Sequence, residues 1–202
     1  MKKTENGTPI VNQEQLIKIL KNSEKGVTVL GPLGRGKTWA LKQWQNVTSN
    51  YDNSFGITSA NSISGMYAAG GMEEVKKYFS YQLQGRLPLV IDDLGTEIIM
   101  GHYGVKLDVI QWLILECYGK GTKMYFTTNL TLEALTERYG SRVADRIKED
   151  TYIIVLEGES RRELTYQNTE QELDTILAKE PEPEPQTEVE EFNELLDGLF
   201  KK

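Results

Sequence analysis

Apolar positions along this 202-residue chain follow two alternating periodicities as far as residue 162. Short runs rich in β-branched and aromatic residues predict strands at residues 27–30, 54–58, 87–92, 123–128 and 152–156. Longer segments with apolar residues three and four positions apart predict helices at residues 13–21, 37–45, 72–82, 105–118, 132–139 and 141–148. This alternation is typical of βαβ units and predicts an α/β fold on a mostly parallel sheet. The apolar runs 89–91 and 152–156 predict central strands covered on both faces.

The first predicted strand is followed directly by a phosphate-binding pattern. The octapeptide reads Gly-Pro-Leu-Gly-Arg-Gly-Lys-Thr, and glycine at its turns lets backbone N–H groups crowd around a triphosphate at a helix N-terminus. In this pattern Lys37 reaches the β- and γ-phosphates, and the Thr38 hydroxyl is a Mg²⁺ ligand. The alternative, a glycine-rich turn without a ligand, is disfavoured by the flanking strand and helix. The residues expected to hold ATP are Gly31, Pro32, Leu33, Gly34, Arg35, Gly36, Lys37, Thr38 and Trp39.

Two adjacent carboxylates end the third predicted strand, in the sequence Leu-Val-Ile-Asp-Asp. Hydrolysis requires a carboxylate that holds the Mg²⁺ shell and a group that orients or deprotonates water. We expect Asp92 to serve the metal and Asp93 to act on the water. Glu97 is a further acid that could lie near the phosphates. The alternative is a solvated turn, for which Asp-Asp-Leu-Gly is also suitable.

Polar and cationic side chains later in the chain complete the candidate site. Asn129 follows the fourth predicted strand, where it could sense the γ-phosphate or position water; a helix N-cap is an equally good interpretation. Arg142 and Arg146, four residues apart on one helical face, and the pair Arg161 and Arg162 could each bring a guanidinium to a γ-phosphate. Surface ion pairing is the alternative for each arginine.

Composition adds limits on the compartment and on the ligands. The chain has one cysteine, Cys117, in an apolar stretch, where a small buried hydrophobic residue is a better interpretation than a nucleophile. One cysteine, no apolar N-terminal stretch and no long apolar run predict a cytoplasmic protein without a membrane anchor. The single histidine, His102, makes a zinc site a poor prediction.

The net charge of −7 is concentrated at the C-terminus. Residues 180–202 hold eight acidic side chains and two lysines, so the preceding 179 residues carry only −1. Residues 180–187 include a Glu-Pro repeat that predicts an extended linker, after a polar, weakly helical extension at 163–179. Apolar residues at helical spacing in 188–202 predict an acidic amphipathic helix: Phe192, Leu195, Leu196, Leu199 and Phe200. Such a segment could dock on a partner, fold back onto its own domain or stay disordered.

Five motifs in this order give the chain a family resemblance. They are the octapeptide, 91–97 (IDDLGTE), 127–130 (TTNL), 139–146 (YGSRVADR) and 158–162 (GESRR). Over residues 20–162 the set resembles the AAA+ ATPases of the DnaC-like helicase-loader type, which are related to the initiator DnaA and to IstB-like transposition ATPases.

This resemblance implies an AAA+ P-loop domain at 26–162 with an open five-stranded parallel sheet, preceded by a helical lead-in at 1–25. It implies that Asn129 is the sensor-1 residue, Arg142 the arginine finger acting on a neighbour's ATP, with Arg146 as a second candidate, and Arg162 the sensor-2 arginine. It also implies ATP-dependent homo-oligomers, contact with single-stranded DNA and a helicase or initiator partner. Loaders carry an N-terminal helicase-binding domain, whereas only about 25 residues precede the first strand here, and we expect no separate lid domain.

Three functions follow as hypotheses. The first is a replication ATPase, weak alone and stimulated by DNA or by its partner. The second is a transposition ATPase that assists a transposase, and the third is an ATP-dependent assembly switch with incidental hydrolysis. Between the second and third strands, Lys76, Lys77, Tyr78 and Phe79 combine charge and aromatic faces that could bind single-stranded DNA, although an ordinary amphipathic helix is the better interpretation.

Overall fold

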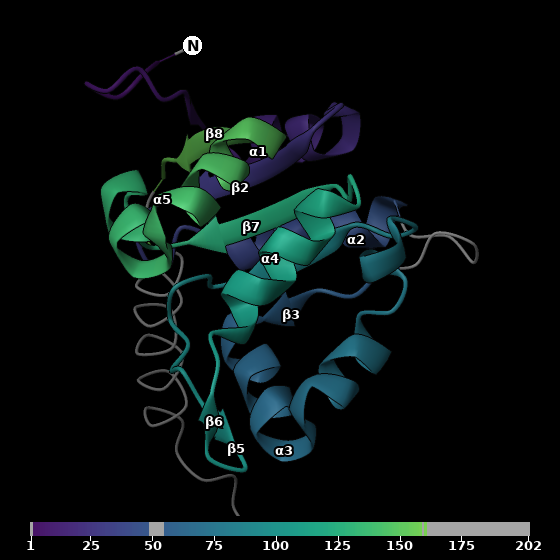
Figure 1. The fold of residues 1–202 in the computed structure, drawn as a ribbon. Coiled ribbons are helices and arrows are strands. Elements are labelled where there is room, and N and C mark those ends of the chain that lie inside the picture. Colours follow the sequence, from purple (N-terminus) through teal and green to yellow (C-terminus); the bar gives the residue numbers. More distant parts are fainter. Residues whose placement is uncertain (1, 49–54, 159, 161–202) are drawn as a thin grey trace, which may run out of the picture. The chain divides into compact units, whose positions relative to one another are not determined.

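The computed structural model describes residues 2–48, 55–158 and 160 of the chain. Its main element is a six-stranded sheet of order β1-β8-β2-β7-β4-β3, in which every neighbouring pair is parallel (Figure 1). The strands are β1 (Ile10–Val11), β2 (Gly26–Leu30), β3 (Thr58–Ser59), β4 (Leu89–Asp92), β7 (Met124–Thr128) and β8 (Thr151–Leu156). A separate antiparallel hairpin is formed by β5 (Gly101–His102) and β6 (Val105–Lys106).

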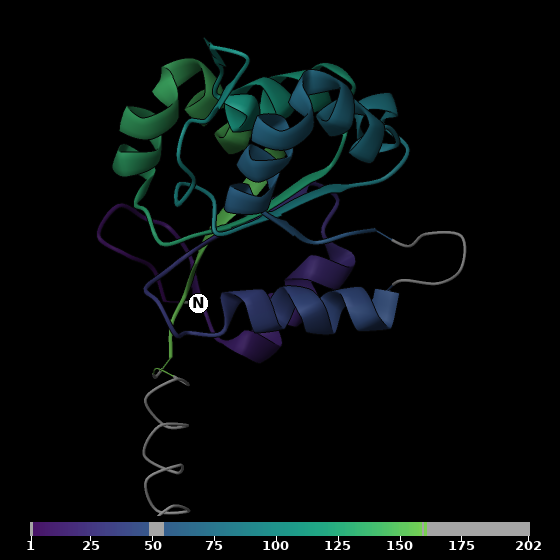
Figure 2. The same cartoon turned by 90° about the horizontal axis from the view of Figure 1, so that it is seen from below.

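In the described part of the chain, five α-helices cover the two faces of the sheet. They are α1 (Gln13–Asn22), α2 (Lys37–Thr48), α3 (Ala60–Tyr78), α4 (Val109–Gly119) and α5 (Leu132–Asp150), and a short 3-10 helix spans Gln82–Gln84. Figure 2 shows α1 and α2 on one face and α3, α4 and α5 on the other. The predicted α/β fold with a helix-covered parallel sheet is therefore confirmed.

Each face of the sheet has its own hydrophobic cluster. Ile91 and Phe126 point into the cluster with α3, α4 and α5, whereas Val90 and Tyr125 point into the cluster with α1 and α2. Successive strand residues face opposite sides, so an uninterrupted apolar strand supplies both clusters. The continuous apolar sequences of the central strands thus follow from burial on both faces.

The prediction of five strands is wrong by one. β1 adds a sixth strand at the edge of the sheet, where Ile10 pairs with Val155 and Val11 with Leu156. A strand of two residues is too short to show an alternating pattern, so the sequence alone does not reveal it. β8 lies between β1 and β2, but Tyr152 on it remains 47% exposed, so this strand is less covered than its apolar sequence predicts.

The predicted helix at 105–118 begins too early. Val105 and Lys106 pair with the strand before them through a turn at Tyr103 and Gly104, both of which have positive φ (46° and 81°). The helix starts after Asp108, whose side chain accepts a hydrogen bond from the backbone N of Gln111 at 3.1 Å. A capping carboxylate thus separates the hairpin from α4.

Two helices contain a glycine that interrupts the helical backbone. Gly71 (φ 66°) divides α3, and Gly140 (φ 77°) divides α5. The second break falls between the two helices predicted at 132–139 and 141–148. The first half of α3 was missed because Ser-Ile-Ser-Gly is weakly helix-forming; Ser59 caps it by accepting from the backbone N of Ser62.

The sheet brings the candidate functional segments together at one edge, the one formed by the carboxyl ends of its strands. Leu30, the last residue of β2, pairs with Thr128 at the end of β7 and with Val155 in β8. Because these strands are parallel, the residues after β2, β4 and β7 leave the sheet at the same edge. None of the described helices is long and apolar enough to cross a membrane. Arg162 and the predicted segments 163–179, 180–187 and 188–202 lie outside the described residues.

Candidate nucleotide-binding site

The loop between β2 and α2 carries the predicted octapeptide, and its glycines adopt conformations that favour glycine. The backbone φ is 148° at Gly31, 79° at Gly34 and 88° at Gly36. A Cβ atom at Gly34 would lie 2.4 Å from Oγ of Ser160, and one at Gly31 would lie 2.9 Å from the carbonyl oxygen of Leu156. The loop therefore requires glycine both for its turns and for its close approach to the end of β8 and to Ser160 beyond it.

Lys37 begins α2 and points back into the loop. Its side chain is buried, and its Nζ donates to the carbonyl oxygens of Gly31 at 2.6 Å and Pro32 at 2.9 Å. The same Nζ donates to Oδ1 of Asn129 at 2.6 Å. The structure thus brings the lysine of the loop together with the polar residue that follows the neighbouring strand.

The interpretation of Asn129 as a helix N-cap is wrong. The cap of α5 is Thr131, whose hydroxyl accepts a hydrogen bond from the backbone N of Ala134 at 3.2 Å. Asn129 lies two residues before the cap, in the turn between β7 and α5, and its amide oxygen faces Lys37. This position allows contact with an anion held by the same lysine.

A second contact joins α2 to Asp92, the last residue of β4. The Thr38 hydroxyl donates to Oδ1 of Asp92 at 3.1 Å, and the Thr127 hydroxyl, from β7, donates to the same carboxylate oxygen. Asp92 is buried, with 7% of its surface exposed. A buried carboxylate held by two hydroxyls has a fixed orientation, and carboxylate and hydroxyl oxygens are the ligands that Mg²⁺ prefers. The residues predicted to hold the metal are therefore adjacent.

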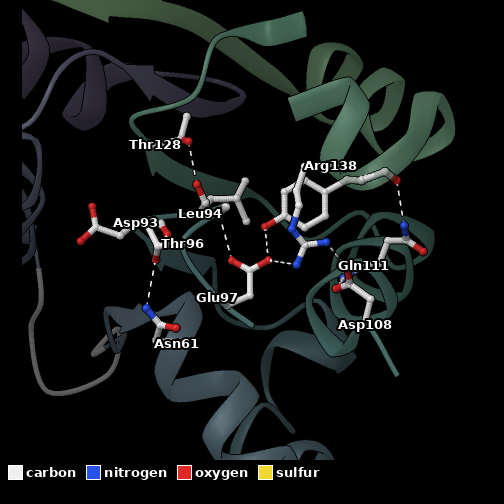
Figure 3. A network of polar contacts seen from close by, with 11 residues as sticks. Asn61, Asp93, Leu94, Thr96, Glu97, Asp108, Gln111, Thr128 and Arg138 are labelled. Carbon is white, nitrogen blue, oxygen red and sulfur yellow. Dashed lines mark hydrogen bonds and ion pairs between the residues drawn. The ribbon is translucent and has the colours of Figure 1, made fainter. Parts of the chain in front are cut away.

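Asp93 leaves the strand in a left-handed conformation. Its φ is 55°, an uncommon value for a residue other than glycine, and its backbone N donates to the Thr127 hydroxyl at 2.9 Å. Figure 3 shows the carboxylates of Asp93 and Glu97 pointing in different directions. Two adjacent acids thus have separate environments, one buried beside Thr38 and one half-buried at the end of the strand.

Glu97 does not lie with the phosphate-binding residues, which corrects the suggestion of a second acid there. Its Oε1 accepts from Arg138 at 2.8 Å and from the Tyr139 hydroxyl at 2.5 Å, and its Oε2 accepts from the backbone N of Gly95 at 2.9 Å. Burial and then the hydrogen bond to Glu97 raise the pKa of Tyr139, so its hydroxyl stays a neutral donor.

The remaining residues of the octapeptide and its flank differ in their surroundings. Leu33 is 62% exposed and Trp39 is 39% exposed. The backbone carbonyl of Arg35 accepts a hydrogen bond from Nε2 of Gln13 at 2.9 Å, which ties the loop to the first turn of α1. Gln13 was not predicted, because a glutamine in the first turn of an amphipathic helix resembles an ordinary solvated residue.

Of the four predicted arginines, Arg161 and Arg162 lie outside the described residues, and no described contact brings Arg142 or Arg146 to the phosphate loop. Arg142 is exposed on α5 beyond the break at Gly140. Arg146 donates to Glu149 at 2.8 Å, and its guanidinium lies 4.5 Å from the ring centroid of Tyr118. Such an exposed ion pair contributes little to stability.

A cavity of about 450 Å³ opens beside the phosphate loop. It lies next to Gly31, Pro32 and Asn129, and the N-terminal segment provides part of its wall through Thr4 and Thr8. No motif marks this N-terminal contribution, since the hydroxyl residues involved are common in turns.

The suggested DNA-binding segment on α3 is only partly exposed. Phe79 is 2% exposed and belongs to the hydrophobic cluster, so it offers no face to a base. Tyr78 is 51% exposed, and Nζ of Lys76 lies 5.8 Å from the ring centroid of Trp112 on α4. Stacking by both aromatic residues is therefore excluded.

Comparison with solved structures shows what this fold resembles. The crystal structure of the DnaC helicase loader matches with a TM-score of 0.55 and 20% identity, covering 76% of this chain and 95% of that one. A putative primosome component from Streptococcus pyogenes serotype M3 matches with a TM-score of 0.54 and 18% identity, covering 74% and 79%. AMPPCP-bound DnaA from Aquifex aeolicus matches with a TM-score of 0.53 and 14% identity, covering 84% and 52%.

No protein-family model and no curated protein sequence matches the chain. At these identities the likeness is one of fold, and it agrees with the AAA+ fold implied by the five sequence motifs. The chain therefore has the fold of DnaC-like helicase loaders and of the AAA+ part of DnaA.

Proposed function

We propose that this chain is an AAA+ ATPase of DNA replication that binds and hydrolyses ATP in the manner of a helicase loader. The observation that carries the proposal is the pair of contacts at one edge of the sheet, Lys37 with Asn129 and Thr38 with Asp92. The first contact joins the octapeptide to the end of β7, which pairs with β2, and the second joins it to the end of β4, which lies beyond β7. A sheet edge built in this way is where open α/β folds bind nucleotides.

In this proposal the triphosphate lies in the loop at the N-terminus of α2. Backbone N–H groups and the helix dipole favour an anion there, and Lys37 contributes its charge to the β- and γ-phosphates. Thr38 and Asp92 would hold Mg²⁺, which when bound neutralises charge on the phosphate oxygens. Asp93 orients or deprotonates the attacking water, and Asn129 contacts the γ-phosphate or that water.

We assign the predicted arginines of α5 a role in the assembly of the homo-oligomer. Arg142 is exposed on α5, where a neighbouring copy can contact it, whereas Arg146 already pairs with Glu149 and lies over Tyr118. Arg142 is therefore the better candidate for a finger that acts on a neighbour's ATP in an ATP-dependent homo-oligomer. The sensor-2 role of Arg162 remains a prediction from the resemblance.

The biological partners are proposed to be a replicative helicase or initiator and single-stranded DNA. The matched DnaC loader, primosome component and DnaA favour this role over assistance to a transposase. Affinity capture from the native cell, with and without ATP, tests the choice: recovery of a transposase in place of a replicative helicase or initiator would reverse it. If residues 180–202 dock on the partner, their deletion abolishes capture.

Nucleotide binding is tested with Lys37→Ala and with a matched control, Lys42→Ala, which removes the same charge from an exposed position on α2. For the unaltered chain, ATP with Mg²⁺ at one hundred times Kd should stabilise the fold by about 2.7 kcal/mol. We expect Lys37→Ala to abolish this rise in melting temperature and Lys42→Ala to retain it. Equal behaviour of the two variants would reject the site.

Hydrolysis is tested separately with Asp93→Asn. This substitution keeps the size of the side chain, so the melting-temperature rise with ATP should remain. Loss of a general base lowers turnover by about 10²- to 10⁴-fold. If phosphate release by Asp93→Asn equals that of the unaltered chain, Asp93 does not act on the water. If hydrolysis is lost but partner capture and biological activity persist, the protein is an assembly switch.

A further inference from the structure

Arg138 forms ion pairs with both ends of the chain segment that connects β4 to α4. Nη2 of Arg138 donates to Oε1 of Glu97 at 2.8 Å, and Nη1 donates to Oδ2 of Asp108 at 2.7 Å (Figure 3). Glu97 lies at the start of this segment and Asp108 at its end, as the N-cap of α4. Arg138 belongs to α5, so one guanidinium holds three parts of the fold together.

The network is buried far more deeply than an ordinary surface ion pair. The side chains of Glu97, Asp108 and Arg138 are 1%, 14% and 23% exposed. Charges that are shielded from water interact strongly and are screened little by salt. The planar guanidinium fork reaches two carboxylates at once, which the single ammonium of a lysine does less well. Replacement of Arg138 by lysine should therefore loosen the segment without removing the charge.

One side of the network fixes the turn that carries Asp93. Oε2 of Glu97 accepts from the backbone N of Gly95, two residues after Asp93. Between these residues, Leu94 donates its backbone N to the carbonyl oxygen of Thr127 at 2.8 Å. A residue with a positive φ, such as Asp93, keeps its conformation only when its surroundings impose it. Glu97 is part of those surroundings.

The other side of the network fixes the break in α5. Tyr139, which donates to Glu97, is followed by Gly140, where the helix is interrupted, and Arg142 lies two residues beyond. Nε2 of Gln111 donates to the carbonyl oxygen of Tyr139 at 2.8 Å. Glu97 therefore contacts both the turn that carries Asp93 and the residue that precedes the break in α5.

We propose that Arg138 is a positioning residue that couples the Asp93 turn to the second half of α5. This inference rests on the proposed ATPase function. The contacts described for Arg138 are with Glu97, Asp108 and the Tyr139 ring, all outside the phosphate loop. In this proposal Arg138 therefore sets the rate of hydrolysis and leaves nucleotide affinity unchanged. Arg138 pairs with Glu97 through one nitrogen and with Asp108 through the other, and the proposed coupling requires both carboxylates.

The test compares Arg138→Lys with Arg86→Lys, the same substitution at an exposed position before β4, at the opposite edge of the sheet. Single-turnover hydrolysis is measured at saturating ATP and Mg²⁺ below the melting temperature, and ATP affinity is measured separately. Small displacements of catalytic groups are costly, so Arg138→Lys should lower the hydrolysis rate on the order of ten- to a hundredfold. ATP affinity should stay within about twofold, because no contact in the phosphate loop changes. Arg86→Lys should match the unaltered chain.

Asp108→Asn provides a milder second variant if Arg138→Lys folds poorly. Asparagine still caps α4 and Glu97 still pairs with Arg138, so the fold should persist while one arm of the network is lost. A slower hydrolysis rate with unchanged affinity supports the proposal. A lower melting temperature with an unchanged rate means that the network only stabilises the fold, and this result overturns it. If the unaltered chain neither binds nor hydrolyses ATP, the proposed function itself fails.

Discussion

Lys37 and Asn129 lie far apart in the sequence, but the distance between Nζ and Oδ1 is 2.6 Å. The contact follows from the register of the sheet, because Leu30 pairs with Thr128 and the next residues of both strands must leave the sheet side by side. A similar relation places Asp92 beside Thr127. At the residue scale, the site is thus created by strand pairing and not by local sequence.

Cys117 provides a direct test of burial at the same scale. Its side chain is fully buried, and burial raises the pKa of the thiol to about 12. The neutral thiol is favoured in the fold, so this contribution to stability is present below the unfolded pKa near 8.5 and is lost as pH rises toward 12. We expect a thiol reagent at pH 8 to label the folded protein very slowly and the denatured protein at once.

The Cys117→Ala variant serves as the control and should give no label in either state. Rapid labelling of the folded protein would contradict the buried position. The result also decides the sequence interpretation, since a nucleophilic cysteine requires an exposed thiolate.

Residues with a strong local motif were predictable, and residues that act through distant contacts were not. Lys37, Thr38 and Asp92 were assigned from two short motifs because phosphate and metal chemistry restrict the residue types and their spacing. Gln13 and Arg138 carry no such restriction. A polar residue on a helix is usually solvated, so only the three-dimensional contacts distinguish these two from their neighbours.

At the scale of elements, the break in α5 decides where Arg142 lies. Gly140 has φ 77° and ψ 159°, a region that residues with a side chain rarely occupy. A Cβ atom at this position would meet no atom within 4 Å, so Gly140→Ala adds backbone strain without a steric clash. We expect a loss of about 1–3 kcal/mol in the free energy of unfolding, measured by denaturant titration.

Gly65 in α3 offers the matched control for this prediction. Its backbone φ is not positive, it is helical, and a Cβ atom there also meets nothing within 4 Å. Gly65→Ala should therefore stabilise the protein by about 0.5–1 kcal/mol through improved helix propensity. If the two substitutions change the free energy of unfolding in opposite directions, the backbone conformation and not the added volume determines the effect. A change in the same direction would refute the helix break at Gly140.

Long elements were predictable from periodicity, and short ones were not. The helices α1, α2 and α5 and the strands β2, β4, β7 and β8 were placed within a few residues of their bounds. β1 has only two residues, and it exists because β8 offers an unpaired edge. The strand β6 was included in the helix predicted at 105–118, since the spacing of its apolar residue is compatible with a helix.

At the scale of the whole molecule, the order of the strands could not be read from the pattern. Alternation of strands and helices requires a parallel sheet but permits several strand orders. The observed order places β2 between β8 and β7, so the phosphate loop emerges from the interior of the sheet, beside the ends of both neighbours. Interior placement is what allows residues after β7 to reach Lys37.

The folded unit does not depend on the C-terminal residues for its described core. Both hydrophobic clusters, as described, are formed by residues between Val11 and Leu156, and Met1–Arg161 forms one compact unit. A chain truncated after residue 179 keeps Arg162 and loses the acidic linker and the predicted amphipathic helix. Because no described core residue is removed, its melting temperature should lie within about 2 °C of that of the full chain, and the rise with ATP should be the same. Calorimetry of both chains checks this expectation. A fall of about 4 °C or more would mean that the C-terminal residues stabilise the unit by about 1 kcal/mol or more, and that their role is folding and not partner capture.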